Sequence, residues 1–421
     1  MIPKPFMRCL AAASVVAAGA LASSAALAVK VGPVEDPLRV VKILKDQPIV
    51  IGVYEVLSGS DVALGLDQYR AIQVAVDDLG GKLLGHPIKL FVEDEGCSAE
   101  GGQTAATKIA ANQQVVIALG GSCSSATRVA APVLWKAGVP AIATSAGAPM
   151  LTDPKRGPAY DGLLRTIFNA GWSGRDTAKW AIEIGKFKKA ATIHDGSTFA
   201  ENLVRTFQAT FREMGGEVCA DEAIAPTDVD MRPLLTKIGT CKPQIIYFPL
   251  FVAAAGHVTR QAREIEGLQD VVLLGSDNLV TKDFLEAAGK AAIGLKFATT
   301  ALEPEAQEAA YPQLVEKYKA KFGEAPIQGF HAQAYDAMML ATKAIEKVAV
   351  KDDAGSTYVP IKALRDTLFA TKNYKGLSGT LTCTEHGDCG AYKLAVYEFV
   401  SGDPATFKVG QNPKRIYPEK Y

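Results

Sequence analysis

The 421-residue chain is too long for one ordinary α/β core and has a length that suits two lobes of common size. Hydrophobic residues make up 48% of the chain and charged residues 21%, which is the composition of a globular protein and excludes a largely disordered one. The formal net charge is zero, so the chain has no basic excess that would favour a nucleic-acid backbone as partner.

The first 28 residues have the parts of a secretory signal. Lys4 and Arg8 supply a positive start, an apolar stretch follows, and residues 26–28 give the small-residue pattern at which signal peptidase cleaves. A membrane anchor is disfavoured because the apolar stretch is short and rich in alanine and serine. We therefore predict a signal peptide over residues 1–28 and a periplasmic location for the mature protein.

Short runs rich in β-branched residues alternate with helical patterns through the first part of the mature chain. This alternation is typical of a parallel, doubly wound sheet with helices on both faces. From the spacing of apolar residues we predict strands at 49–54, 88–92, 115–120 and 139–143, and helices at 67–79, 105–111 and 124–136.

The same alternation begins again near residue 190, which indicates a second α/β lobe. After about residue 302 the pattern changes to helices, and strands return only near residue 381 and at 394–399. We predict strands at 190–194, 217–219, 244–248 and 271–275, and helices at 200–214, 231–238, 253–266, 282–288, 306–322, 332–348 and 361–370.

A loop rich in glycine and serine, residues 120–127, follows the third predicted strand and opens a helix. The first turn of a helix has unpaired N–H groups and a positive dipole end, which suit a carboxylate, and Ser124 adds a hydroxyl donor. Serine is also preferred at helix N-caps, so an ordinary cap is an equally good interpretation of Ser124 from this pattern alone.

A second loop of small residues, 143–149, follows the next predicted strand. Small residues let a ligand approach the backbone closely, although taken alone the pattern is more typical of a tight loop between strand and helix. The two loops follow neighbouring strands at their carboxyl ends, where open α/β sheets bind ligands. Together they predict one ligand-binding edge.

An acidic residue, Asp277, follows a predicted strand of the second lobe. A carboxylate in this place would face the first lobe and meet a ligand ammonium group. The alternative is an Asx turn or a helix cap, which aspartate commonly makes.

The sequence lacks the motifs of several enzyme classes, namely G-x-S-x-G, the P-loop, H-E-x-x-H and G-x-G-x-x-G. Its five histidines show no metal-ligand spacing, and no pattern marks a nucleophile with its base. We therefore predict that the protein is not an enzyme and holds neither a cofactor nor a metal. An amidase-like hydrolase is the alternative, and the same absences disfavour it.

Cleavage of the predicted signal leaves six cysteines in the mature chain. An even number of cysteines in an exported chain indicates disulfides, and the count alone leaves their pairing open. A metal site is disfavoured because the chain contains no C-x-x-C pair. Proximity along the chain favours pairs of Cys97 with Cys123, Cys219 with Cys241, and Cys383 with Cys389.

Several short blocks match, in order, the pattern of a known family. They are Leu57-Ser58-Gly59, residues 93–97, residues 121–125, residues 149–152, Leu164-Arg165-Thr166, Ile193-His194-Asp195 and residues 260–263. From about Pro48 to Phe399 the chain thus resembles the leucine/isoleucine/valine-binding protein family, the type I periplasmic binding proteins of branched-chain amino acid importers. No block is decisive alone, but their order and spacing over most of the chain are specific.

The resemblance implies the fold class α/β, with two doubly wound parallel-sheet lobes joined by a three-segment hinge and a ligand held in the cleft between them. On this basis we expect residues 48–168 plus 300–378 to form the N-terminal lobe. Residues 169–299 plus 379–421 would form the C-terminal lobe.

The resemblance also implies roles for residues of the first lobe. In the family, a serine just after the second cysteine of a disulfide binds the ligand carboxylate. That serine is Ser124 here, and the disulfide would be Cys97–Cys123. The loop of small residues gives backbone contacts to the ligand, which in this chain would come from Ser145, Ala146 and Gly147.

The remaining implied positions depart from the family pattern. An acid in the second lobe takes the ligand ammonium, and Asp277 stands where glutamate is usual. Phe199 and Phe251 fall on two family tyrosines and lack their hydroxyls, and Leu64 stands where an aromatic residue often lines the first loop. The resemblance therefore implies a carboxylate site and an ammonium site in a pocket that is more apolar than usual.

The predicted function is that of a periplasmic substrate-binding protein, a monomer that delivers a branched-chain or related apolar amino acid to the permease subunits of an ABC importer. One alternative is a binding protein for an aromatic acid or a short amide. Another is a sensory ligand-binding module, which would use the same fold attached to a membrane segment.

Overall fold

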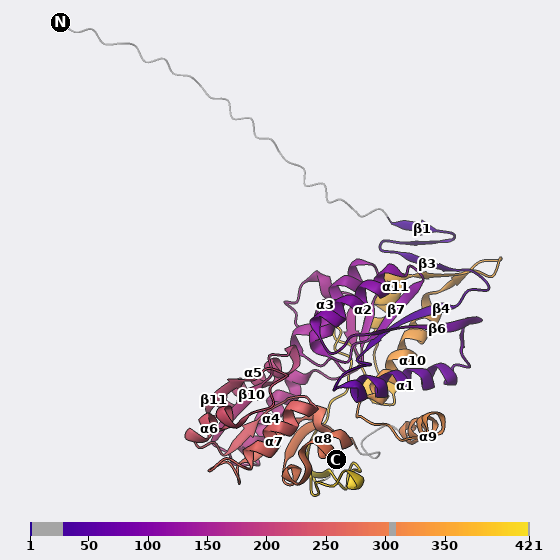
Figure 1. Ribbon diagram of the computed structural model, residues 1–421. Helices are drawn as coiled ribbons and strands as arrows, with labels where there is room; N and C mark the ends of the chain where they lie inside the picture. The colour runs from indigo at the N-terminus through magenta and orange to yellow at the C-terminus, as the bar shows by residue number, and fades with distance from the viewer. Residues whose placement is uncertain (2–27, 303–308, 420–421) are drawn as a thin grey trace.

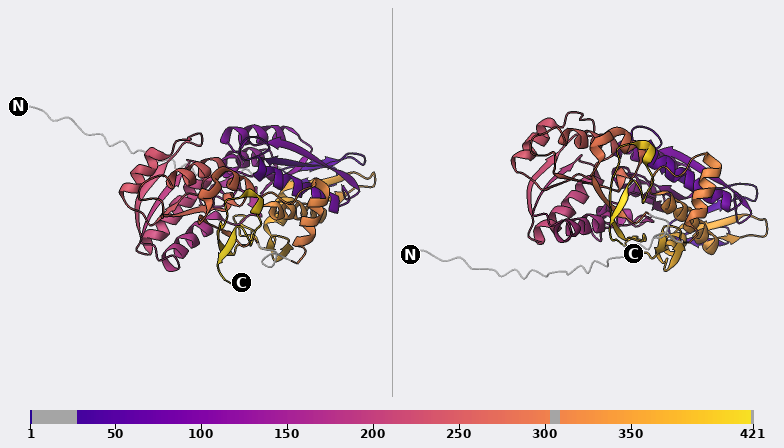
Figure 2. Two further views of the ribbon diagram at one scale, coloured as in Figure 1. Left: turned by 60° about the horizontal axis from the view of Figure 1, so that its bottom comes forward. Right: turned by 90° about the horizontal axis from the view of Figure 1, so that it is seen from below.

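The computed structural model describes residue 1 and residues 28–302 and 309–419. The predicted signal peptide therefore lies almost entirely outside the described residues. Figures 1 and 2 show that the described chain forms two lobes that lie end to end. None of the helices in these ranges is long and apolar enough to span a bilayer.

The sheet of the first lobe has six strands, in the order β5 (Lys82–Leu83), β6 (His86–Asp94), β4 (Ile49–Glu55), β7 (Val115–Gly120), β8 (Ala141–Ala143) and β9 (Leu163–Arg165). All neighbours run parallel except β5, which pairs antiparallel with β6. Every residue of β4 and β7 is buried. Strands that are buried on both faces read as continuous apolar runs, which explains why the sequence predicts these two so clearly.

Helices cover both faces of this sheet. One face packs its apolar side chains against α1, α10 and α11, and the other against α2 and α3. The helices of this lobe are α1 (Val62–Asp78), α2 (Ala99–Ala111), α3 (Ser124–Lys136), α9 (Tyr311–Phe322), α10 (His331–Val348) and α11 (Ile361–Phe369).

The sheet of the second lobe has seven strands, in the order β11 (Glu217–Ala223), β10 (Lys189–His194), β12 (Ile245–Tyr247), β13 (Val272–Ser276), β14 (Lys296–Thr300), β19 (Leu394–Glu398) and β20 (Lys414–Tyr417). The strands from β11 to β14 are parallel, whereas β19 and β20 are antiparallel to their neighbours. Its helices are α4 (Ala170–Glu183), α5 (Thr198–Glu213), α6 (Arg232–Thr240), α7 (Val252–Ala262) and α8 (Lys282–Ala288). The predicted two-lobed α/β fold is confirmed, with antiparallel strands added at the sheet edges.

The chain before residue 48 forms strands that the sequence does not predict. β1 (Val29–Val31) and β2 (Val34–Asp36) make a hairpin at the outer end of the first lobe (Figure 1). β3 (Val40–Ile43) pairs with β16 (Thr357–Pro360), which pairs in turn with β15 (Val350–Lys351). The strands are short, and β3 and β16 lie more than 300 residues apart in sequence. A local sequence pattern therefore cannot predict that they pair.

Several further elements were also missed by the sequence prediction. β9 and β14 are short, and α4 contains Gly171 and Gly174, which weaken a helical pattern. β17 (Tyr374–Gly376) was missed as well, whereas the strand predicted near residue 381 is β18 (Gly379–Leu381), with which β17 forms a hairpin. The helix predicted at 306–322 begins at Tyr311 in the described residues, and its first three predicted residues lie outside them.

The structure contains the three disulfides that proximity favours, which are Cys97–Cys123, Cys219–Cys241 and Cys383–Cys389. The predicted lobe boundaries remain predictions. In the core of the first lobe lie Leu381, Cys383 and Cys389. The third segment by which the chain passes from one lobe to the other, the third crossing, would therefore come after residue 389 instead of at 378/379.

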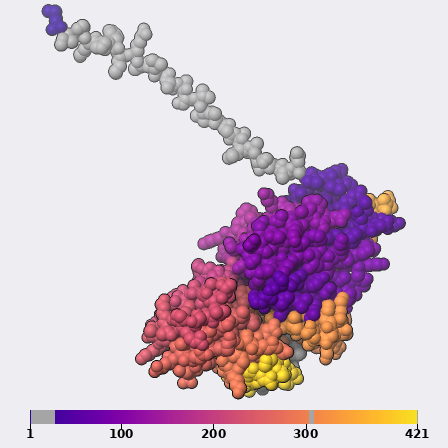
Figure 3. Space-filling view, viewed as in Figure 1, coloured from indigo at the N-terminus to yellow at the C-terminus, as the bar shows by residue number. Residues whose placement is uncertain are grey.

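One buried ion pair ties the chain just before this third crossing to the rest of the first lobe. Arg165 at the end of β9 is fully buried, and its guanidinium bonds to Asp388 at 2.6 Å. The same guanidinium donates to the carbonyl of Ala148 at 2.9 Å and to the hydroxyl of Thr152 at 2.6 Å. The chain just before the crossing therefore connects directly to the loop that follows β8. Figure 3 shows the two lobes in contact over the surface between them.

Candidate functional site

The two loops predicted to bind a ligand lie side by side at the carboxyl ends of β7 and β8. Ser145 donates its hydroxyl proton to the carbonyl of Ser122 at 2.9 Å, and the N–H of Ala146 donates to the carbonyl of Gly121 at 3.1 Å. The carbonyl of Gly147 accepts from the N–H of Ala170 at 2.9 Å, where the chain enters the second lobe. These bonds hold both loops in one fixed arrangement.

Ser124 is the first residue of α3, and Cys123 occupies the cap position. The Ser124 hydroxyl accepts a hydrogen bond from the N–H of Ala148 at 3.1 Å, so it does not cap its own helix. The alternative interpretation of Ser124 as an ordinary N-cap is therefore wrong. Ser124 is 2% exposed and links the two loops at the start of α3, the end of the helix that carries a partial positive charge.

Two buried acids lie beneath these loops. Glu55, the last residue of β4, is fully buried and accepts hydrogen bonds from the hydroxyls of Ser122 at 2.5 Å and Thr144 at 2.8 Å. Glu95 is equally buried and accepts from the N–H of Cys123 at 2.6 Å. Burial raises the pKa of Glu55 to about 8, and burial together with the charge of Glu55 raises the pKa of Glu95. The carboxyl group of Glu55 is therefore predominantly protonated at neutral pH.

Asp277 lies on the second lobe in a 3-10 turn, Asp277–Leu279, directly after β13. Its side chain is buried, and this burial raises its pKa to about 7, although hydrogen bonds from its own backbone N–H and that of Asn278 oppose the rise. Its charge contributes to the raised pKa of Tyr247 and of Tyr392, so all three side chains lie near one another. An acid with this pKa is about half ionised at neutral pH and would gain from a cationic partner.

An apolar cluster joins the two lobes between these polar groups. Leu64 from α1 and Phe330 from the first lobe pack with Phe251 from the second, and Tyr392 of the third crossing joins them. Phe199 belongs to the core of the second lobe, and its ring centroid lies 6.2 Å from that of Phe251. The remaining members of the cluster are Val56, Cys97, Cys123, Ala126, Ile167, Phe168 and Trp172.

A small pocket opens beside this cluster. Leu64 and Phe251 line it together with Asn278 and Gln328, whereas Ser124, Ser145, Ala146, Gly147, Phe199 and Asp277 do not. Asn278 Nδ2 and Gln328 Oε1 are buried and have no hydrogen-bond partner in the described part of the chain. The pocket is completed by Ser60, Asp61, Ala63, Val252 and Asp283.

Sequence reasoning missed Phe330, Asn278, Gln328 and Asp61. Asn278 directly follows Asp277, so two consecutive polar residues after a predicted strand could have indicated that Asn278 belongs to the site. Phe330 and Gln328 lie in the turn before α10, and the sequence offered no strand end to mark that turn as part of the cleft.

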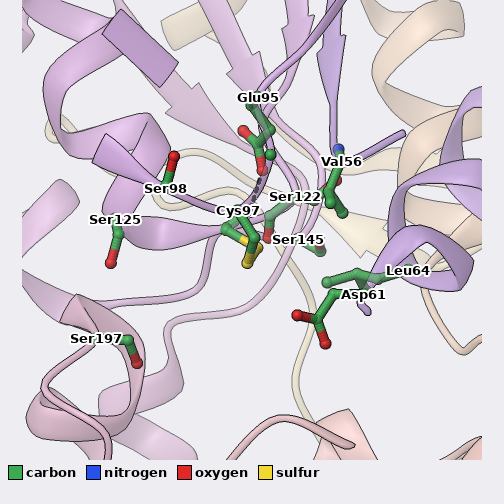
Figure 4. The surroundings of a disulfide bond; sticks show 12 residues. Val56, Asp61, Leu64, Glu95, Cys97, Ser98, Ser122, Ser125, Ser145 and Ser197 are labelled. Carbon is green, nitrogen blue, oxygen red and sulfur yellow. Dashed lines mark hydrogen bonds between the residues drawn. A yellow bond between two sulfur atoms is a disulfide. The ribbon is translucent and has the colours of Figure 1, made fainter. Parts of the chain in front are cut away.

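The two helix starts that face each other across the cleft are in direct contact. The Ser125 hydroxyl on α3 accepts a hydrogen bond from the N–H of Thr198, the first residue of α5, at 3.0 Å. Figure 4 shows Ser125 and Ser197 on one side of the Cys97–Cys123 disulfide, with Asp61 and Leu64 on the other. The charge of Asp195 on the second lobe adds to the raised pKa of Asp61, whose main cause is burial. The structure thus shows the lobes closed on one another.

Within the described residues, no group of three His, Cys, Asp or Glu side chains is arranged to hold a metal ion. The polar groups at the cleft are loop N–H groups and hydroxyls on one side and a carboxyl on the other, with aromatic and aliphatic side chains between them. Such a donor set binds an organic molecule that has both charged and apolar parts.

Two α/β lobes that close on an apolar cluster, with a helix start on one side and a buried acid on the other, define a two-lobed solute-binding protein. The chain belongs to the periplasmic binding protein family, whose pattern matches residues 48–403. It is 27% identical to the Leu/Ile/Val-binding protein BraC3 of Rhizobium johnstonii over 84% of this chain and 92% of that protein. It is 24% identical to the Leu/Ile/Val-binding protein of Escherichia coli K12 over 86% of this chain and 93% of that protein.

Solved structures show the same fold. A leucine-binding protein, LivK, from Thermotoga maritima superposes with a TM-score of 0.74 at 23% identity and covers 84% of this chain and 96% of its own. A solute-binding protein of an ABC transporter from R. palustris in complex with benzoate superposes with a TM-score of 0.71 at 23% identity and covers 87% of this chain and 94% of its own.

Proposed function

We propose that this chain is the periplasmic substrate-binding protein of an ABC importer and that it binds a branched-chain or related apolar amino acid between its lobes. The names of its relatives support the amino-acid class, and the predicted signal at residues 1–28 supports the location. In this proposal the protein acts as a monomer, catalyses no reaction, and passes its ligand to the permease subunits.

The first lobe would receive the ligand carboxylate. The N–H groups at the start of α3 and the N–H of Gly147 would supply donors, whereas the N–H groups of Ser145 and Ala146 already donate to the carbonyl of Gly121, and the positive end of the helix favours an anion. Ser124 joins the two loops and presents its hydroxyl at the same point. Hydrogen bonds to a charged group in a dry cleft are stronger than neutral ones, so they would anchor the amino-acid head.

The second lobe would receive the ligand ammonium at Asp277. A cation beside this buried carboxyl stabilises its ionised form and lowers its pKa below the value of about 7 in the ligand-free protein. The side chain of the amino acid would then lie against Leu64, Phe251 and Phe330, which are apolar and lack hydroxyl groups.

The observation that carries this proposal is the apolar cluster that joins both lobes beside the start of α3, since Cys123 and Ala126 belong to it together with Phe251 of the second lobe. Closure of two lobes on a ligand is a general behaviour of periplasmic binding proteins. The ligand favours the closed form only through contacts that the open form lacks, which here are contacts with both lobes at once.

A screen of the mature chain, residues 29–421, tests the proposal. We expect leucine, isoleucine and valine to raise the melting temperature and to bind in calorimetry, since a ligand that binds only the folded state stabilises it. The variant Leu64→Ala should weaken leucine binding more than alanine binding, because alanine reaches less of the apolar wall. Failure of every amino acid to bind would contradict the proposal.

An aromatic acid is the second candidate ligand. The rings of Phe199 and Phe251 lie 6.2 Å apart and offer an apolar aromatic wall. Benzoate has no ammonium group, so its binding would not depend on Asp277. Tight benzoate binding that survives Asp277→Ala would select this candidate over the amino acid.

A further inference from the structure

We propose that Glu55 is a positioning residue that ties the two loops, residues 120–127 and 143–149, to the central strand β4. Its carboxyl group is protonated when a ligand carboxylate is bound, which keeps the buried floor of the site neutral. Ligand binding is therefore accompanied by uptake of a proton. The inference rests on the proposed function in one respect, because it assumes that the ligand has a carboxylate.

The geometry places one carboxyl group under two loops. Glu55 ends β4, which lies between β6 and β7 in the sheet. Its two oxygens reach different loops, one the Ser122 hydroxyl before α3 and the other the Thr144 hydroxyl after β8. Ser122 in turn accepts from the N–H of Val56 at 3.1 Å, which closes the network onto the end of β4. Removal of Glu55 would therefore release both loops at once.

A second buried acid, Glu95, makes a negative charge on Glu55 more unfavourable. Glu95 lies against the same loop, so close that a Cβ on Gly121 would stand 2.0 Å from its Oε2 atom. That oxygen has no hydrogen-bond partner in the described part of the chain, and no described cation forms an ion pair with either glutamate. Two ionised carboxylates without a cation in one buried site repel each other strongly, so protons must neutralise them.

The other titratable groups near Glu55 do not supply a compensating charge. Tyr54 precedes it on β4 and has a raised pKa, mainly through burial and then through the two glutamates. Asp94 at the end of β6 is a further acid, held by the N–H of Leu57 and the Ser58 hydroxyl. Arg165, near the second loop, is already paired with Asp388.

The position of Glu55 beneath an anion site gives its proton a function. An ionised Glu55 would repel the carboxylate that the loops bind, whereas a protonated one would not. Either form keeps both contacts, because each hydroxyl can donate or accept. The loops thus hold their shape while the charge beneath them changes. Binding of a carboxylate should therefore raise the pKa of Glu55 above its ligand-free value of about 8 and draw a proton from the solvent.

Calorimetry in buffers of different ionisation enthalpy tests the inference directly. For leucine at pH 8.5 we expect the wild-type protein to take up roughly half a proton on binding, for a pKa that rises by about one unit. For the same shift, affinity should fall by roughly fourfold from pH 8 to pH 9.5 beyond the loss caused by the ligand's own amino group. The variant Glu55→Gln keeps an acceptor and gains a donor but cannot titrate, so it should show neither the proton uptake nor this extra decline.

Two further variants separate the proton from a general structural effect. Glu100→Gln removes an exposed acid in the first turn of α2 and should behave as the wild type. Thr144→Val removes a hydroxyl that stabilises the ionised form of Glu55, so the alkaline decline should move to higher pH, while Thr144→Ser should restore its position. Equal proton uptake in the wild type and in Glu55→Gln would overturn the inference.

A readout without ligand keeps this test separate from the proposed function. The folded pKa of Glu55 lies above the ordinary value of 4.5, so its contribution to stability is largest below pH 4.5 and falls until about pH 8. The melting temperature of the wild type should therefore fall relative to Glu55→Gln between pH 5 and pH 8. A constant difference over that range would show that Glu55 is ionised throughout and would contradict the inference even if no amino acid binds.

Discussion

The two lobes present very different surfaces to the cleft between them. On the first lobe, the loops of Ser122 and Ser145 are bonded to each other, to the end of β4 and to the chain that enters the second lobe. On the second lobe, Asp277 is held by groups of its own turn and the residue before it, and Asn278 Nδ2 has no partner in the described residues. On the first lobe most polar groups of the two loops are already paired, whereas Asp277 and Asn278 of the second lobe have capacity that a ligand can satisfy.

This difference gives the two lobes different parts in recognition. A receptor whose donors are fixed in advance loses little entropy when it binds, so the first lobe is suited to the invariant carboxylate of an amino acid. Groups that are buried without partners lower the stability of the closed form unless a ligand pairs with them. The second lobe is therefore suited to make closure depend on the ligand. Disruption of the first lobe should then cost mainly stability, and disruption of the second should cost mainly affinity.

The largest effect is expected from Asp388→Ala. The carboxylate of Asp388 neutralises the fully buried Arg165 and also accepts from the Thr152 hydroxyl and the Asn169 amide. Removal of one member of a buried ion pair leaves an uncompensated charge and typically costs about 3–5 kcal/mol. Denaturant and thermal unfolding of the variant should show a loss of this size.

The matched control for this prediction is Asp353→Ala. Asp353 is exposed, and its removal should change stability by no more than about 0.5 kcal/mol. If Asp388→Ala is no less stable than this control, the ion pair does not hold the chain before the third crossing to the rest of the first lobe.

Asp277→Ala should have the largest effect on binding. Loss of the carboxylate removes a charge-assisted hydrogen bond to the ligand ammonium, which should weaken amino-acid binding by more than roughly tenfold. The fold should be retained, because the hydrogen bonds of this side chain stay within its own turn and the residue before it. Calorimetry with leucine measures the change, and Asp270→Asn, an exposed acid of the second lobe away from the pocket, serves as control. Unchanged affinity would remove Asp277 from the site.

A second contrast explains how much of the fold the sequence could predict. Some strands have a clear apolar pattern of their own, and others form only because a partner strand is present. Central strands such as β4 and β7 are buried on both faces, so their apolar runs stand out. β9 and β14 have few residues, and β3 depends on a partner, β16, that is distant in sequence. Such strands are specified by tertiary pairing, which a local pattern does not contain.

The candidate site divides in the same way. The loops around Ser124 and Ser145 follow strand ends, so the rule for ligand binding in α/β sheets finds them from the sequence alone. Glu55 directly follows the strand predicted at 49–54, and nothing in the neighbouring sequence indicates that hydroxyls 67 and 89 residues away bond to it. Phe330 and Gln328 reach the cleft from the turn before α10. Only the tertiary fold brings this turn to the cleft, so a local sequence pattern cannot indicate it.

Acid pH should weaken binding through the second lobe alone. Because the pKa of Asp277 is about 7 in the ligand-free protein, protonation from pH 8 to pH 6 would reduce its ionised fraction by roughly tenfold. The affinity for leucine should fall by up to that factor, while the variant Asp277→Asn should show a nearly flat profile over this range, with only the rise of about twofold or less that Glu55 adds toward acid pH. A wild-type profile that is equally flat would show that the ionised form of Asp277 takes no part in binding.

The smallest predicted effect concerns the one described side-chain hydrogen bond between α3 and α5. Ser125→Ala removes the acceptor for the N–H of Thr198, a bond of 3.0 Å that joins the two lobes and that we expect to break when they open. A neutral hydrogen bond contributes about 0.5–1.5 kcal/mol, so leucine affinity should fall by roughly two- to tenfold and the ligand-free protein should become more open in small-angle scattering.

Ser197→Ala is the matched control, since Ser197 caps α5 within the second lobe by accepting from the N–H of Ala200. That variant should lower the melting temperature with little change in the scattering profile, because its lost bond is present in open and closed forms alike. If the two serine variants instead have the same effect on scattering and affinity, then the contact between the helix starts does not contribute to closure, and the ligand must close the lobes through Asp277 and the apolar cluster alone.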